Sequence, residues 1–264
     1  MTAPTAQPAR TRRHVPRLRA AVLTFRVLVR QVITPGRLAA LGALGALMVL
    51  VGWLVGITAG DGERTAAGLL RDGAGYADGF GLIIIVPIVA LVFGSSVLGE
   101  TREDGTLVYL WLRPMDRGPV VVGAAVAAAA AALPLTVVPT ALGGWLAADR
   151  VAGSADLVWG AAAAAALGTA AYSSLFVLVG LLVRKPIMWG IGYVLLWEGL
   201  AVGLGNFAAR LSLRGYTRSV LSHLGGIDYG FDPYTTTTSV VVLAAVSVAG
   251  LILAAVRLNR LDVA

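Results

Sequence analysis

The sequence contains no cysteine and little charge, since only 13% of its 264 residues are Asp, Glu, Lys or Arg. The absence of cysteine excludes disulfides, thiolate metal sites and cysteine nucleophiles. Histidine is scarce too, with only His14 in the N-terminal tail and His223 in a loop. No G-x-S-x-G, H-E-x-x-H or paired-carboxylate arrangement accompanies them. We therefore expect no enzyme, no metal site and no cofactor bound by this chain.

The apolar content is correspondingly high. Hydrophobic residues make up 58% of the chain and the mean hydropathy is +0.82, whereas about a quarter of a typical soluble domain is charged. A transmembrane helix needs roughly 20 mostly apolar residues, and a β-barrel would show short alternating segments instead of continuous apolar runs. We expect an all-α integral membrane protein with six transmembrane helices, at residues 38–57, 81–98, 119–147, 157–183, 186–205 and 238–256.

The basic residues indicate the orientation of these six spans. Fifteen of the 21 Lys and Arg residues fall before the first span, after the last span, or in the loops at 99–118 and 184–185. The positive-inside rule places both termini and these two loops in the cytoplasm. Topology thus accounts for the net charge of +7, and we expect no nucleic-acid partner. A single Lys among these basic residues is typical of a GC-rich genome, and we expect a multi-pass protein in the cytoplasmic (inner) membrane of a bacterium.

The chain before the first span divides into two parts. Residues 1–15 are polar and basic and predict a disordered cytoplasmic tail, followed by a single transmembrane domain at 16–264. Residues 16–33 predict an amphipathic elbow helix in the headgroup layer, whose alternative is a solvated basic helix. Its apolar face comprises Leu18, Val22, Phe25, Val29 and Ile33, and its basic face comprises Arg19, Arg26 and Arg30.

Residues 206–237 are too polar to cross the membrane and predict short extracellular helices on or in the outer leaflet, ended by Gly225–Gly226.

Small-xxx-small pairs occur at Gly52 and Gly56 and at Gly199 and Gly203. Such pairs permit close helix approach, and we expect packing inside the chain rather than a dimer seam.

A charged interruption, "ETREDGTLVYLWLRPMDR", lies between the second and third spans. The second helix can continue into water as far as Asp104, Gly105 can end it, and "TLVYLWL" can form a short apolar helix before Arg113 and Pro114. An apolar helix held between charges suits docking into a groove on a soluble partner. A helix that returns to the interface, with Tyr109 and Trp111 as belt residues, is also compatible with the composition.

These residues resemble the segment after the second span in type-2 ABC exporter permeases, where an acidic residue and a Gly-Thr pair precede a Leu-rich stretch, a Pro and an Arg. The likeness extends to the layout of elbow helix, six spans and extracellular helices. The sequence departs from the family pattern where relatives often carry a Lys after a Gly, because Ala124 follows Gly123. The residues that the resemblance assigns to coupling and ATPase docking are Glu100, Arg102, Glu103, Asp104, Gly105, Thr106, Leu107, Leu110, Trp111, Arg113, Pro114 and Arg117.

The resemblance implies a permease subunit of an ATP-driven exporter, paired with itself or with a second permease. Each copy would dock a separate ATP-binding subunit through the coupling segment at 99–118, with ATP and Mg²⁺ on that partner. The sequence itself has no G-x-x-x-x-G-K-[ST] motif, so this chain has no P-loop of its own. The transported substrate is not indicated.

Polar residues inside the spans offer a second hypothesis. Glu198 lies in the fifth run, where ionisation is costly, so it contacts a cavity or partner, is protonated, or lies near the outer interface. Tyr172, Ser173 and Thr136 are candidates to line a translocation path with it, although intramembrane hydroxyls often bond to their own helix. The alternatives to an ABC permease are a proton-coupled secondary carrier that uses Glu198 and a membrane scaffold that transports nothing.

Overall fold

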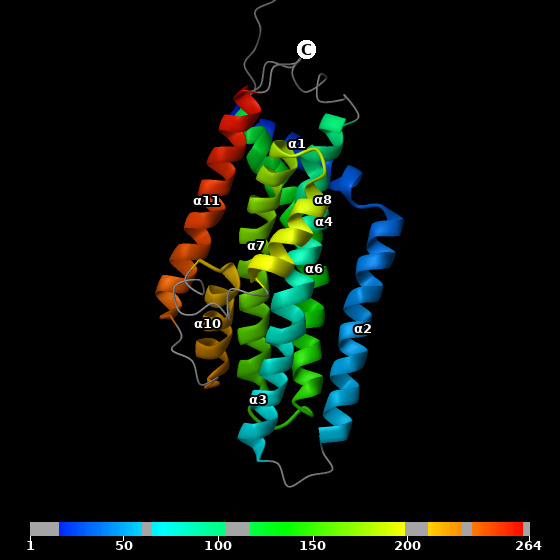
Figure 1. Ribbon diagram of the computed structural model, residues 1–264, viewed down its shortest axis with the longest axis vertical. Coiled ribbons are helices and arrows are strands. Elements are labelled where there is room, and N and C mark those ends of the chain that lie inside the picture. Colours follow the sequence, from blue (N-terminus) through cyan, green and yellow to red (C-terminus); the bar gives the residue numbers. More distant parts are fainter. Residues whose placement is uncertain (1–15, 60–64, 104–116, 199–210, 229–233, 261–264) are drawn as a thin grey trace, which may run out of the picture.

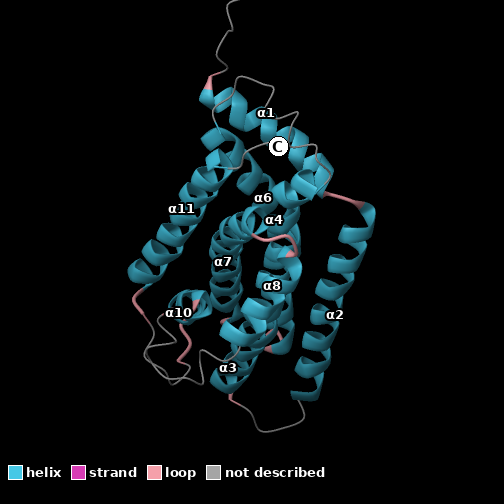
Figure 2. Cartoon of the chain, turned by 45° about the horizontal axis from the view of Figure 1, so that its top comes forward, coloured by secondary structure: helices cyan, strands magenta, loops and turns pink. Residues whose placement is uncertain are grey.

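A computed structural model describes residues 16–59, 65–103, 117–198, 211–228 and 234–260, and their regular structure is entirely helical. The long helices run along one axis of the molecule (Figure 1), and α1 (Arg17–Val32) lies across one end of them (Figure 2). Five helical stretches are long and apolar enough to cross a membrane. The predicted all-α membrane-protein character is therefore confirmed. The stretches are Pro35–Thr58, Ala66–Glu100, Arg117–Ala147, Ser154–Leu182 and Thr236–Arg260.

Four of these stretches agree closely with the predicted runs. They correspond to α2 (Pro35–Ala59), α6 (Arg117–Ala147), α7 (Ser154–Leu182) and α11 (Thr236–Arg260). Their ends agree to within a few residues because a long run of apolar side chains identifies a helix locally.

The second predicted span, by contrast, begins too late. The helix starts in α3 (Ala66–Tyr76), continues through the π-helical η1 (Ala77–Ile85) and ends in α4 (Val86–Glu103). The π-helical stretch ends just before Pro87, whose ring and missing N–H disturb regular α-helical bonding. As a consequence Asp78, expected in an outer loop, lies within a helix and is buried.

The fifth predicted span, 186–205, is only partly described. Its first residues form α8 (Pro186–Gly192) and the π-helical η2 (Tyr193–Glu198), and 199–210 lie outside the described residues. The described part is too short to cross a membrane alone. A membrane crossing by residues 186–205, and with it a total of six spans, therefore stays a prediction.

The two segments that were predicted to form helices at the membrane surfaces, 16–33 and 206–237, each contain a helix. The amphipathic segment at 16–33 forms α1, but the buried side of α1 is not the predicted apolar face. That buried side consists of Ala20, Thr24, Leu28 and Val32, whereas Leu18 is 79% exposed. The closest approach of α1 to α6 is at Gly123 of α6, where an added Cβ would lie 2.5 Å from the Ala21 carbonyl oxygen and 3.0 Å from Thr24 Cβ. The residues 213–225 form α10 (Leu213–Gly225), which Gly226 ends in a left-handed conformation at φ 62°, as predicted.

The centre of the bundle is α7, which packs against α4, α6, α10 and α11. The helix α10 contacts the interior of the α7 span, because Gly160 and Gly168 of α7 lie against Gly225 and Thr217. By contrast, α2 and α11 lie at the edges of the bundle (Figure 1), and many of their apolar side chains are exposed. An apolar exposed surface of this extent suits a lipid environment.

Glycine allows the peripheral helix α2 to approach α6. A Cβ added at Gly52 would lie 2.5 Å from the Gly143 carbonyl oxygen, and one at Gly56 would lie 2.0 Å from that of Leu146. Gly52 and Gly56 therefore serve packing inside the chain, as predicted. Gly199 and Gly203 of the second such pair lie outside the described residues.

We expect Gly56→Ala to lower the free energy of unfolding by about 1–3 kcal/mol, because an added methyl group must displace backbone. Gly42→Ala is the matched control in the same helix, since nothing lies within 4 Å of its added Cβ, and it should stabilise the helix slightly. Thermal unfolding of both variants in the same detergent measures the difference. Equal melting temperatures would contradict the packing of α2 on α6.

Candidate functional site

The predicted coupling segment is anchored at both of its ends. Glu100, Arg102 and Glu103 lie on the last turns of α4, which continues past the apolar span. Arg117 begins α6. The predicted residues between these anchors lie outside the described part of the chain, and they are Asp104, Gly105, Thr106, Leu107, Leu110, Trp111, Arg113 and Pro114.

At the first anchor, the carboxylate of Glu100 forms an ion pair with the guanidinium group of Arg37 at the start of α2. Arg37 also donates to the Val32 carbonyl oxygen at the end of α1, 3.3 Å away, and to Ser96 Oγ of α4, 3.4 Å away. A single side chain thus connects α1, α2 and α4. The sequence reasoning missed this role of Arg37, which lies 63 residues from Glu100.

At the second anchor, Arg117 contacts the C-terminal end of α11. Its Nη1 donates to the carbonyl oxygen of Asn259 at 2.7 Å and to that of Leu258 at 3.4 Å. Cations near a helix C-terminus satisfy its free carbonyl groups and interact favourably with the helix dipole. Arg117 therefore fixes the start of α6 to the end of α11.

The predicted basic face of the elbow helix is exposed, since Arg19, Arg26 and Arg30 all lie on the outer side of α1. Phe25 is half-buried and packs against the core of the bundle. The charges of α1 are therefore available to the surroundings, while its buried side holds it on the bundle.

A second polar cluster surrounds the N-terminal end of α10. The Glu198 carboxylate accepts hydrogen bonds from the backbone N–H groups of Leu213 and Arg214, each at 3.1 Å. The hydroxyl groups of Tyr193, at 2.7 Å, and Ser212 also donate to it. A carboxylate at this position satisfies N–H groups that have no partner within the helix and faces the positive end of the helix dipole. Glu198, which is fully buried, therefore caps α10.

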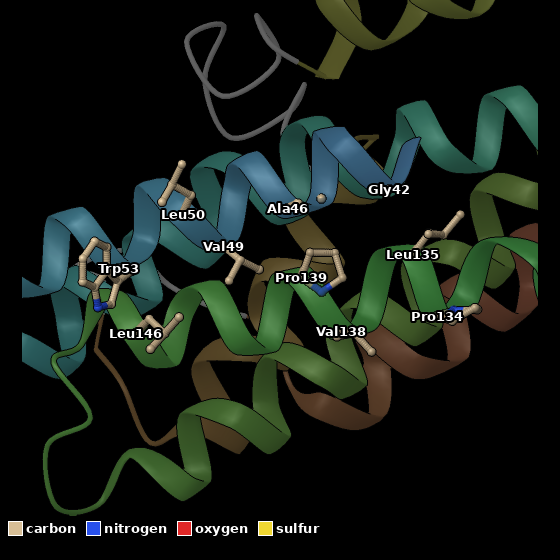
Figure 3. Close-up of a pocket in the computed structure, with 11 residues that line it drawn as sticks. Gly42, Ala46, Val49, Leu50, Trp53, Pro134, Leu135, Val138, Pro139 and Leu146 are labelled. Carbon is tan, nitrogen blue, oxygen red and sulfur yellow. The ribbon is translucent and has the colours of Figure 1, made fainter. Parts of the chain in front are cut away.

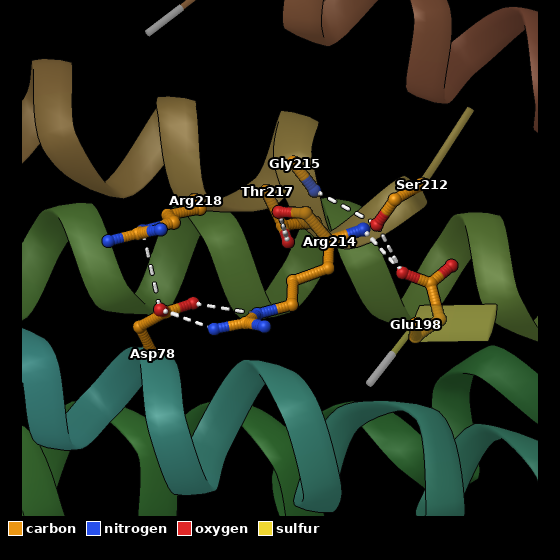
Figure 4. A network of polar contacts seen from close by, with 7 residues as sticks. All are labelled: Asp78, Glu198, Ser212, Arg214, Gly215, Thr217 and Arg218. Atoms are coloured by element: carbon orange, nitrogen blue, oxygen red, sulfur yellow. Dashed lines mark hydrogen bonds and ion pairs between the residues drawn. The ribbon is translucent and has the colours of Figure 1, made fainter. Parts of the chain in front are cut away.

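The same helix is held from another side by Asp78 of η1. Arg214 approaches the Asp78 carboxylate with Nη2 at 3.0 Å from Oδ2 and Nε at 3.4 Å from Oδ1. Arg218, one turn further along α10, places Nε 3.4 Å from Oδ2. Figure 4 shows this arrangement, in which Arg214 links the two carboxylates: its side chain binds Asp78 and its backbone binds Glu198.

Both carboxylates belong to π-helical stretches, Asp78 to η1 and Glu198 to η2. Such stretches occur mostly as single turns within α-helices, frequently at functional sites. Here two of them direct carboxylates toward one short helix. Both carboxyl groups are buried and each has hydrogen-bond donors within reach, as burial of a polar group requires.

The other residues predicted to line a path are buried in helix packing. Thr136 of α6 and Thr169 of α7 share a hydrogen bond of 2.8 Å. Ser173 and Tyr172 are buried on α7, and their hydroxyl groups have no hydrogen-bond partner among the described residues. A role for these residues in a path stays a prediction.

One groove lies on the side of the bundle, between α2 and α6 (Figure 3). It has a volume of about 520 Å³ and is lined by apolar side chains, among them Trp53, Leu50 and Pro139. None of the predicted path residues lines it. It is an apolar surface between a peripheral helix and the core.

Comparison with known proteins does not assign the chain to a family: no family model matches it, and no curated protein matches it significantly.

The Asp78 pairs lead to a stability prediction. Asp78→Asn should lower the free energy of unfolding by about 1–3 kcal/mol, because the partly buried guanidinium groups of Arg214 and Arg218 lose the charge of a buried carboxylate. Adding Arg214→Gln should cost less than the sum of the two single changes, with a coupling of about 0.5–3 kcal/mol. Asp156→Asn, at an exposed position in the first turn of α7, is the control. Additive effects in thermal unfolding would contradict the ion pair.

The cap on α10 leads to a separate prediction. Glu198→Gln removes the negative charge and turns an amide toward N–H donors, which should cost about 1–3 kcal/mol locally. Hydrogen exchange at Leu213 and Arg214 should become faster, while exchange in α6 stays unchanged. A residue used only for proton transfer would leave the protection of α10 as it was.

Proposed function

We propose that this chain is the membrane-spanning subunit of an ATP-driven ABC exporter, powered by a separate ATP-binding subunit. The proposal rests first on the resemblance of Glu100–Arg117 and of the overall layout to type-2 ABC permeases. The observation that carries it is the anchoring of this segment at both ends, through Glu100 and Arg37 on one side and Arg117 on the other.

This anchoring supplies a route for mechanical coupling. A displacement of the segment would act on α4 directly, on α1 and α2 through Arg37, and on α11 through Arg117. ATP binding that draws two partner subunits together would move the segment, and these helices would change the access of a substrate cavity. Two copies, or one copy and a second permease, would enclose that cavity.

The geometry gives less support to a proton-coupled carrier. A carrier residue must exchange a proton with water, yet Glu198 is fully buried and its carboxylate accepts four hydrogen bonds from groups that hold α10. A scaffold without transport would not need an apolar stretch of sequence between charged residues such as that at 106–112.

The docking role of the segment can be tested with Leu110→Asp and Trp111→Asp. We expect each variant to lose most of the ATP-binding subunit when the tagged chain is purified from its own membranes, because a charge would face an apolar groove on that partner. Photolabelling with 8-azido-ATP measures how much nucleotide-binding polypeptide is captured. Ala155→Asp, exposed in the first turn of α7 at the other end of the bundle, should retain it. Undiminished capture by both variants would contradict docking through this segment.

A further inference from the structure

A second groove lies at the same end of the bundle as the coupling segment. It has a volume of about 560 Å³ and separates the last turns of α4 from the turn between α7 and α8. Its walls include Ser95 and Gly99 of α4, Arg184 and Lys185 of the turn, and Ile187 and Met188 of α8. The groove therefore has a charged part, at the turn between α7 and α8, and an apolar part, at the start of α8.

The charged part of this groove carries an excess of positive charge. Arg184 and Lys185 are exposed, and no described carboxylate lies within ion-pair distance of either. Glu100 also lines the groove, but its charge is already matched by Arg37. The two cations therefore suit the binding of an anion.

The apolar part continues from the cations onto α8. Ile187 is 50% exposed and Met188 is 62% exposed, so both offer hydrocarbon surface to the surroundings. The apolar stretches of two candidate spans end beside the groove, at Glu100 and at Leu182. The groove therefore lies where the hydrocarbon layer meets the headgroups, about half a bilayer thickness from the membrane centre.

A buried hydroxyl group completes the wall. Ser95 is 1% exposed, and its Oγ has no hydrogen-bond partner among the described residues. A buried hydroxyl without a partner costs free energy, so a donor or acceptor that reached this wall would be favoured.

We propose that this groove binds one anionic phospholipid, with its phosphate at Arg184 and Lys185 and the upper part of an acyl chain along Ile187 and Met188. Basic pockets between membrane helices bind anionic headgroups through charge. A free phosphate would use the cations but not the apolar wall. This inference is independent of the proposed transport function.

The test is native mass spectrometry of the detergent-solubilised chain with phosphatidylglycerol and phosphatidylcholine of identical acyl chains. We expect the chain to retain one phosphatidylglycerol with a preference of about tenfold or more over phosphatidylcholine, as two cations imply. The double variant R184Q/K185Q should abolish the preference. The double variant R71Q/R150Q is the matched control, because it removes the same charge from two exposed positions, one in α3 and one after the end of α6, and should keep the preference.

A second variant blocks the groove without changing its charge. A Cβ at Gly99 would make only ordinary contacts, at 3.6 Å from the Gly180 carbonyl oxygen and 3.9 Å from Pro186. Gly99→Leu should therefore fold and should lower phosphatidylglycerol retention, whereas Gly99→Ala should retain more of it than Gly99→Leu. Thermal unfolding checks that all variants are folded.

A soluble headgroup separates a lipid site from a simple anion site. Glycerophosphoglycerol in large excess should leave the bound phosphatidylglycerol in place, because it lacks the acyl chains. Displacement by this compound, equal retention of the two lipids, or an unchanged preference in R184Q/K185Q would each overturn the proposal.

Discussion

The burial of α10 against α7 is the constraint on which the surrounding structure depends. Backbone N–H groups and guanidinium groups that are shielded from water need acceptors within the protein. Glu198 supplies acceptors for the first N–H groups of α10, and Asp78 supplies the counter-ion for Arg214 and Arg218. The two acids come from different elements, so α10 joins η1 and η2. A short polar helix can pack beside the central helix only because both carboxylates face it.

The opposite end of the bundle is organised by single arginines instead. Arg37 joins three helices near the end of α4, and Arg117 joins α6 to α11. These contacts are partly exposed, and ion pairs of this kind contribute little to stability. Their effect is geometric, because they fix the ends of helices around the charged segment.

The sequence predicted those parts of this architecture that depend on local composition. The runs at 119–147 and 238–256 agree with α6 and α11, and Gly52 and Gly56 were identified as packing residues. The start of the second helix was predicted wrongly because Asp78 resembles a loop residue until its partner is known, and Arg214 lies 136 residues away. The cap by Glu198 could not be predicted either, since it depends on where α10 begins in space. For the coupling segment only the two anchors lie in the described residues, so its docking role rests on resemblance and on their contacts.

The central claim, that an ATP-binding chain powers this one, is tested most directly by the mass of the intact assembly. The chain would be extracted with its surrounding lipid from its own membrane and analysed by native mass spectrometry, which detects any bound polypeptide by its mass. The account predicts an assembly in which two permease chains, each of 27.1 kDa if both are copies of this one, accompany an equal number of nucleotide-binding subunits. A chain that emerges alone or only with lipid, from membranes where it is fully folded, would contradict it.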